Sequence, residues 1–159
     1  MGSSESDGES ITADGLVALK AELFDLESAG RREISKRILT ARGHGDLKEN
    51  AEYHVAKEDQ AHLETRIKRL RQRLRNAVVV ESASGGNTFA FGRSAEIRDE
   101  SNGETQTWTI VGPTEANRAA GKISAESPVA RALLGRAAGD LVEVQTPRGV
   151  RKLRIERLL

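Results

Sequence analysis

Hydrophobic residues recur at intervals of three and four positions through most of the first half of the chain. From Thr12 to about Gly43 the sequence is almost free of helix breakers, and this spacing predicts a helix with Thr12 as its N-cap. After Gly30 the apolar positions resume one residue late, at Ile34 and Ile38, so we expect a local distortion or a rotated interface there. The regular part of this coiled-coil seam consists of Leu16, Leu19, Leu23 and Leu26.

A second helical pattern runs from about Asn50 to Asn76 and keeps a better register. The connector between the two helices is short, so the simplest arrangement is an antiparallel hairpin with HGDLKEN, residues 44–50, at its tip. At a rise of ~1.5 Å per residue, a helix of about 27 residues extends roughly 40 Å. The apolar edge of this second helix consists of Tyr53, Ala56, Gln60, Leu63, Ile67, Leu70, Leu74 and Ala77.

The pattern changes from Ala77 onward, where alternating or β-branched runs are separated by Gly, Asn and Ser turns. The Asn102-Gly103 pair suits a two-residue hairpin turn, and a further turn is predicted at Pro147 to Gly149. A short helix is predicted between these strands, with Ser127 as N-cap and Pro128 in its first position. The predicted fold class is therefore a helical hairpin (residues 11–77) followed by an α+β domain, an antiparallel sheet with one short helix (residues 78–159). We expect residues 1–10 to form a flexible tail.

Composition narrows the possible functions. The 159 residues include no cysteine, which excludes disulfides and thiolate metal sites and suits a reducing compartment. The longest apolar runs, such as Ala77 to Val80, are far shorter than the ~20 residues that cross a bilayer, and residues 1–10 lack the features of a secretory signal. We therefore expect a cytoplasmic protein. A net charge of +1 argues against an autonomous nucleic-acid binder.

The predicted tip carries two carboxylates, Asp46 and Glu49. Acids at a hairpin tip can simply keep the turn solvated. They can also form half of a metal site, because two carboxylates alone are too few oxygens for a hard divalent ion and a partner would have to supply the rest. Two-metal phosphoryl chemistry uses such groups. A zinc site with His44 and His54 is a poor alternative, since these histidines lack helical i, i+4 spacing.

Six basic residues and no acid occupy the ten positions of RIKRLRQRLR, from Arg66 to Arg75. A run of this kind is usually a solvated helix face. Without counter-charges, however, it would attract phosphates, as expected for a hairpin that lies along a nucleic acid. The basic residues are Arg66, Lys68, Arg69, Arg71, Arg73 and Arg75.

These stretches resemble the GreA/GreB family of bacterial transcript-cleavage factors, over about Ile11 to Leu159. The tip ARGHGDLKENAEYH, from Ala41 to His54, resembles the family's most recognisable stretch. Residues 1–10 lie outside the resemblance, and the proline often found after the arginines of GRREI is absent. Further matches follow in order: FG at Phe91-Gly92, WTIVGPTEA at Trp108 to Ala116, GKISAESPVARALLG at Gly121 to Gly135, and TPRG at Thr146 to Gly149.

The resemblance implies an antiparallel coiled coil followed by an FKBP-like α+β domain without prolyl isomerase activity. It implies that the chain acts as a monomer on bacterial RNA polymerase. The C-terminal domain would dock on the β′ coiled coil at the rim of the secondary channel, with Ser127 and Pro128 as candidate docking residues. A helix cap and a first-turn proline would explain the same two residues.

The resemblance also implies roles at the tip. Asp46 and Glu49 would help to hold a second Mg²⁺ in the polymerase site, an ion that the free protein does not bind stably, and would orient the water that hydrolyses backtracked RNA. The chain would then not be an enzyme itself. Asn50 and Tyr53 would be supporting residues near the RNA 3′ end. The candidates for contact with extruded RNA are Arg69, Arg71, Arg73 and Arg75.

Three other functions compete with cleavage stimulation. Paralogues in the superfamily enter the same channel and inhibit the polymerase, although their tips tend to be altered or more acidic than DLKEN. A generic coiled-coil interaction or chaperone module would explain the helices without the tip. A self-contained nuclease would need more metal ligands than Asp46 and Glu49.

Overall fold

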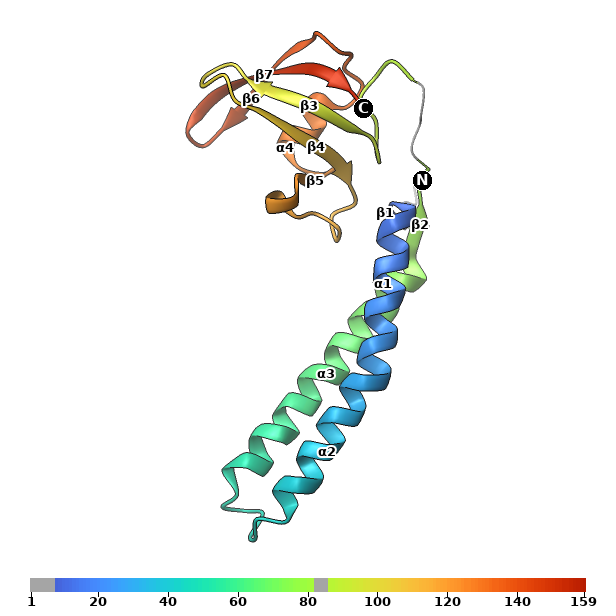
Figure 1. Ribbon diagram of the computed structural model, residues 1–159, viewed down its shortest axis with the longest axis vertical. Coiled ribbons are helices and arrows are strands. Elements are labelled where there is room, and N and C mark those ends of the chain that lie inside the picture. Colours follow the sequence, from blue (N-terminus) through green and yellow to red (C-terminus); the bar gives the residue numbers. More distant parts are fainter. Residues whose placement is uncertain (1–7, 82–85) are drawn as a thin grey trace, which may run out of the picture. The chain divides into compact units, whose positions relative to one another are not determined.

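A computed structural model of the protein describes residues 8–81 and 86–159, and the chain divides into two compact units (Figure 1). One unit is the helical segment Leu16–Asn76, and the other combines the residues up to Gly15 with Ala77–Leu159. Most of the predicted flexible tail lies outside the described residues, but Glu9 and Ser10 belong to strand β1. Within the described ranges, no helix is both long enough and apolar enough to cross a membrane.

The helical unit is a hairpin, as predicted. Its first arm is continuous through α1 (Ala13–Asp25), the π-helix η2 (Leu26–Gly30) and α2 (Arg31–Arg42), and its second arm is α3 (Ala51–Asn76). Figure 1 shows the two arms running side by side, with the connecting turn at their far end. The Thr12 hydroxyl accepts a hydrogen bond from the Gly15 amide at 3.0 Å, which confirms Thr12 as the N-cap.

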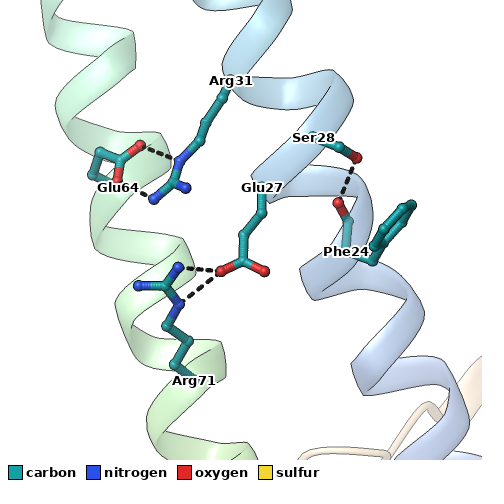
Figure 2. Close-up of polar contacts among 6 residues, drawn as sticks. All are labelled: Phe24, Glu27, Ser28, Arg31, Glu64 and Arg71. Carbon is teal, nitrogen blue, oxygen red and sulfur yellow. Dashed lines mark hydrogen bonds and ion pairs between the residues drawn. The ribbon is translucent and has the colours of Figure 1, made fainter.

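The expected distortion of the first arm is the π-helix η2. A π-helix closes i→i+5 hydrogen bonds, so one turn accommodates an additional residue without breaking the helix. This additional residue accounts for the delay of one position with which the apolar seam resumes after Leu26. Gly30 keeps helical angles (φ −61°, ψ −47°) and faces the seam, where an added Cβ would lie 3.5 Å from Leu63. In the same segment the Ser28 hydroxyl donates to the Phe24 carbonyl at 2.6 Å (Figure 2).

The predicted seam residues form the core of the hairpin. Leu23, Ile67 and Leu70 are buried. Burial of a large aliphatic side chain stabilises a fold by about 1.5–3 kcal/mol, so the seam is the main source of hairpin stability. Leu19, Leu26, Leu63 and Leu74 pack against this cluster, and closer to the tip Ile38, Ala41 and Ala56 are buried.

Four ion pairs join the two arms along the edges of the seam. In α1 and η2 the partners are glutamates that meet arginines of α3, whereas in α2 they are arginines that meet acids of α3. From its N-terminal to its C-terminal end, each arm therefore carries two acids and then two arginines. Because the arms are antiparallel, opposite charges face each other. The pairs are Glu22–Arg66, Glu27–Arg71, Arg31–Glu64 and Arg37–Asp59, of which the middle two are drawn in Figure 2.

The other unit contains a five-stranded sheet in the order β5-β4-β3-β7-β6. Four strands are antiparallel neighbours, but β5 runs parallel to β4, so the sheet is mixed and the prediction of a wholly antiparallel sheet is wrong in this detail. Residues 112–121, which include the 3-10 helix η3 (Arg118–Ala120), connect the end of β4 to the start of β5. They return the chain to the level of Thr109 in β4, which pairs with Lys122, the first residue of β5. The strands are β3 (Ser94–Asp99), β4 (Thr105–Val111), β5 (Lys122–Ser124), β6 (Leu141–Thr146) and β7 (Gly149–Leu158).

One face of this sheet carries the core, and α4 (Pro128–Leu133) contributes to it through Ala130 and Leu133. Inward residues alternate along the strands, as in the pair Val142 and Val144 of β6. The helical hairpin followed by an α+β domain confirms the predicted fold class. The buried core residues are Phe89, Ala95, Ile97, Ile110, Ala130, Leu133, Val142, Val144, Leu153 and Ile155.

The turn between β3 and β4 is longer than the predicted two residues. The Asp99 amide donates to the Glu104 carbonyl (2.9 Å), and the Gly103 amide donates to the Asp99 carbonyl (2.8 Å). Asp99 Oδ1 also accepts from the amide and hydroxyl of Ser101, and these local bonds fold the additional residues into the turn. Gly103 has φ +75°, which favours glycine at this position.

A short parallel pair of strands was not predicted. It joins β1 (Glu9–Ile11), just before α1, to β2 (Ala77–Val79), just after α3. Glu9 pairs with Ala77. These residues are far apart in the sequence, so no local pattern could reveal the pairing.

Candidate functional site

The two predicted acids lie in a tight turn between α2 and α3. The Glu49 amide donates to the Asp46 carbonyl (3.3 Å), and the Asn50 amide donates to the Leu47 carbonyl (3.4 Å). Gly45 opens the turn with φ +111°, a conformation that L-residues with a side chain rarely adopt. The turn therefore holds both acids within one reversal of the chain.

Both carboxylates are available to a partner. Asp46 and Glu49 are exposed. Asp46 Oδ1 accepts a hydrogen bond from the Lys48 amide at 2.9 Å, an Asx turn that orients the carboxylate. In the described part of the chain no ion pair engages either acid, so three of the four carboxylate oxygens can serve as ligands.

Asn50 is the one buried polar or charged residue among those described, with 9% of its surface exposed. Its side-chain amide donates to the Ala41 carbonyl at 2.5 Å, near the end of α2, and its side-chain oxygen accepts from the Tyr53 amide at 3.0 Å. Asn50 is thus the N-cap of α3 and ties the two arms together where the turn begins and ends. The family resemblance implied that Asn50 is a supporting residue near the RNA 3′ end, and that role stays a prediction; in the structure its side chain points into the hairpin.

The aromatic residues of the tip cover the start of α3. Tyr53 is half-buried, and its ring packs edge-on against the ring of His54, with centroids 5.6 Å apart. His54 Nε2 lies 3.2 Å from the Lys48 carbonyl, between the two acids in the sequence. The sequence did not reveal this contact, because the contact depends on the path of the turn.

The histidines do not form the alternative zinc site. His44 Nε2 lies 3.4 Å from a Glu52 carboxylate oxygen, while His54 faces the Lys48 carbonyl. Among the described residues, no three His, Cys, Asp or Glu side chains are grouped so that they could hold a metal ion.

The basic residues of α3 lie on two different flanks of the seam. Residues four apart share a side of a helix, so Arg71 and Arg75 lie on one flank and Arg69 and Arg73 on the other. Arg71 donates from Nε to Glu27 at 2.7 Å and is committed to the hairpin (Figure 2). For Arg69, Arg73 and Arg75 no ion pair is found in the described part of the chain.

Ser127 and Pro128 begin α4, as predicted. The Ser127 hydroxyl accepts from the Ala130 amide (3.2 Å) and donates to the Ser124 carbonyl (2.7 Å), while Pro128 occupies the first turn and is exposed. These bonds confirm the N-cap. They leave the outer surface of Pro128 free for a partner.

Two family models match consecutive parts of the chain. A model described as "Transcription elongation factor, N-terminal" matches residues 9–79, and one described as "Transcription elongation factor, GreA/GreB, C-term" matches residues 84–158. The chain belongs to the GreA/GreB family of transcription elongation factors. The family resemblance of the tip and of the C-terminal motifs is confirmed. Both acids, Asn50 and the basic residues of α3 lie in the first match, and Ser127 and Pro128 lie in the second.

Relatives of this GreA/GreB chain are similar over nearly their whole length. Transcription elongation factor GreA of Anaeromyxobacter sp. (strain K) is 45% identical over 147 residues, which cover 92% of this chain and 89% of the relative. GreA of Rhodopseudomonas palustris (strain TIE-1) is 44% identical over 149 residues, covering 93% and 94%. The similarity therefore includes both the hairpin and the C-terminal unit.

Solved structures of related factors are also similar to the chain. GreA factor homolog 1 (Gfh1) of Thermus thermophilus is 29% identical, with a TM-score of 0.42 and coverage of 96% of this chain and 99% of that chain. The GreA/GreB factor of Nitrosomonas europaea is 31% identical, with a TM-score of 0.41 and coverage of 64% and 89%. The family assignment rests on the sequence matches.

Proposed function

We propose that this GreA/GreB factor inserts its hairpin into the secondary channel of bacterial RNA polymerase and stimulates Mg²⁺-dependent cleavage of backtracked nascent RNA. The observation that carries the proposal is the pair of exposed acids, Asp46 and Glu49, in one tight turn at the end of the hairpin. Glu27 and Glu64, which lie along the seam, are each paired with an arginine of the other arm, whereas no ion pair engages the two tip acids within the described residues.

The oxygen atoms at the tip suit Mg²⁺, which prefers carboxylate and water ligands. They are too few for a complete octahedral site, and the described residues supply no third ligand. Asp46 and Glu49 would therefore hold the ion jointly with the polymerase. A second Mg²⁺ bound in this way supplies charge stabilisation and a more acidic bound water for phosphodiester hydrolysis.

The chain's own contribution is positioning. Because Asp46 Oδ1 is tied to the Lys48 amide, its second oxygen has a defined direction. Glu49 lies three residues later, after the turn closed by its own amide. We infer that these carboxylates orient the attacking water and accept its hydrogen bonds, while the polymerase binds the scissile phosphate and the RNA 3′ end. The chain is then not an enzyme itself, since the reacting bond lies in the partner.

The rest of the chain would deliver the tip. We propose that the C-terminal unit, including the surface at Ser127 and Pro128, docks on the β′ subunit at the channel rim and that the factor acts as a monomer. On α3, Arg69 and Arg73 form a basic flank with no ion pair among the described residues, and Arg75 lies beside Arg71 on the other flank. Exposed guanidinium groups without counter-charges attract RNA phosphates.

The test uses stalled, backtracked elongation complexes with radiolabelled RNA, wild-type protein and the double variant Asp46→Asn, Glu49→Gln. These substitutions keep the side-chain shape and remove only the charge. We expect the cleavage rate to fall by roughly 100-fold or more, the scale for removing groups that stabilise a transition state. Binding to polymerase, measured by competition with labelled wild-type protein, should remain within about two-fold because the docking surface is unchanged.

The matched control is Glu52→Gln, which removes one exposed negative charge close to the tip, near His44. It should cleave like the wild type. Undiminished cleavage by the double variant would refute the role of the acids. Slower nucleotide addition with no shortened RNA from the wild type would instead identify an inhibitor that uses the same channel. RNA cleavage without polymerase would identify a nuclease.

A further inference from the structure

The peptide backbone between the two acids is held from both sides. On one side, Asp46 Oδ1 accepts from the Lys48 amide at 2.9 Å. On the other, His54 Nε2 lies 3.2 Å from the Lys48 carbonyl, which belongs to the peptide bond leading into Glu49. The two contacts restrain consecutive peptide units, and these units set the relative direction of the two acid side chains.

His54 is anchored well enough to act as a restraint. Its own amide donates to the Asn50 carbonyl at 3.2 Å in the first turn of α3. Asn50 is buried and bound to both Ala41 and Tyr53, so the start of the helix is tied to the end of α2. The ring of Tyr53 lies edge-on to the imidazole, with ring centroids 5.6 Å apart. The His54 ring therefore reaches back from a fixed helix to an exposed turn.

The chemistry of the contact defines what a substitution must preserve. A carbonyl oxygen only accepts hydrogen bonds, so His54 Nε2 carries the proton. The neutral Nε2–H tautomer and the imidazolium both meet this requirement. A glutamine side chain ends in an amide donor at a similar distance from the backbone, whereas alanine has no donor.

We propose that His54 is a positioning residue for the acid-bearing turn, which it holds through the Lys48 carbonyl so that Asp46 and Glu49 are presented together. This rests on the proposed function of the two acids. The side-chain contact of His54 with the turn is to the Lys48 carbonyl and not to either carboxylate, so in this proposal it acts through the backbone. A misplaced group lowers a rate even when it is still present, because the reacting geometry is populated less often.

The experiment compares His54→Ala and His54→Gln with the wild type in two assays. In the first, backbone ¹⁵N relaxation of the free protein reports order parameters for residues 46–49. We expect them to fall in His54→Ala and to stay at the wild-type level in His54→Gln. In the second, cleavage in backtracked complexes at saturating factor should fall about 5- to 10-fold in His54→Ala, the equivalent of one ordinary hydrogen bond, and recover to within two-fold in His54→Gln.

The control variant is His62→Ala. His62 is an exposed histidine of the same helix whose ring lies 4.0 Å from a Glu58 carboxylate oxygen, and its loss should change neither assay. Unchanged order parameters in His54→Ala would overturn the proposal, as would a loosened turn that cleaves at the wild-type rate. If the wild type itself stimulates no cleavage, the proposed function fails, and the relaxation data alone decide whether His54 orders the turn.

Discussion

The guanidinium of Arg31 in α2 and the carboxylate of Glu64 in α3 meet through two hydrogen bonds, 3.0 Å from Nε and 2.8 Å from Nη2, one to each oxygen (Figure 2). This fork raises the pKa of Arg31 and lowers that of Glu64, with the hydrogen bonds as the main cause in both cases. Seven residues further along α3, Arg71 meets Glu27 with the charges reversed. Because the order of charges mirrors between the arms, sliding one arm past the other would bring like charges together.

The first prediction concerns this alignment. Glu64→Arg should lower the urea midpoint of unfolding only slightly, since both side chains of the pair are more than a third exposed and surface pairs contribute little. Adding Arg31→Glu should recover much of the loss by restoring an opposite pair. Urea unfolding at low salt, followed by circular dichroism, would measure the coupling. A double-mutant cycle without coupling energy would show that the fork contributes nothing to stability.

The second prediction concerns Gly30. An added Cβ would make ordinary contacts with Leu63 (3.5 Å) and Leu26 (3.8 Å), and the backbone is already helical. Gly30→Ala should therefore raise the free energy of unfolding by about 0.5–1 kcal/mol, the helix preference of alanine over glycine. Thermal unfolding would measure the change.

The matched control for that substitution is Gly45→Ala in the tip. An added Cβ there meets open space, but φ is +111°, so the strain of the backbone should lower stability. A lower melting temperature for Gly30→Ala would mean that the π-helix η2 requires glycine for a reason other than the space around it.

The third prediction separates the two basic flanks of α3. Arg69→Gln with Arg73→Gln should leave hairpin stability unchanged and reduce crosslinking to extruded RNA several-fold, since neither arginine is paired within the described residues. Arg71→Gln should instead lower stability, because it removes the partner of Glu27. Equal loss of crosslinking in both variants would show that the ion pair opens when RNA binds.

The fourth prediction is a pH dependence in the C-terminal unit. The hydroxyl and amide of Ser101, and then the guanidinium of Arg151, lower the pKa of Asp99 below its ordinary value of 3.8. A lowered folded-state pKa means that Asp99 contributes stability above pH ~4 and that this contribution is lost as the pH falls through the folded value. Asp99→Asn should flatten the fall of melting temperature below the ordinary carboxyl pKa of 3.8, measured by calorimetry. An unchanged slope would assign the acid sensitivity to other groups.

The helical half of the fold could be predicted closely because its signals are local. The spacing of three and four residues between apolar positions identified the seam, which is buried at Leu23, Ile67 and Leu70. The shift of this spacing by one residue identified the position of η2. Capping is equally local, so Thr12 and Ser127 were recognisable as N-caps from the sequence. At the tip, the pattern identified the two acids, and their role in cleavage stays a prediction.

The sequence by itself determined which segments are helical, where the chain reverses and which residues the tip contains, because backbone propensity and periodicity act over a few neighbouring positions. Only the tertiary structure decided which groups meet across the chain. It directed Asn50 inward, committed Arg71 to Glu27, set β5 parallel to β4 and brought His54 to the Lys48 carbonyl. Each of these depends on the path of an intervening turn or on the facing of two elements, which composition and spacing do not encode.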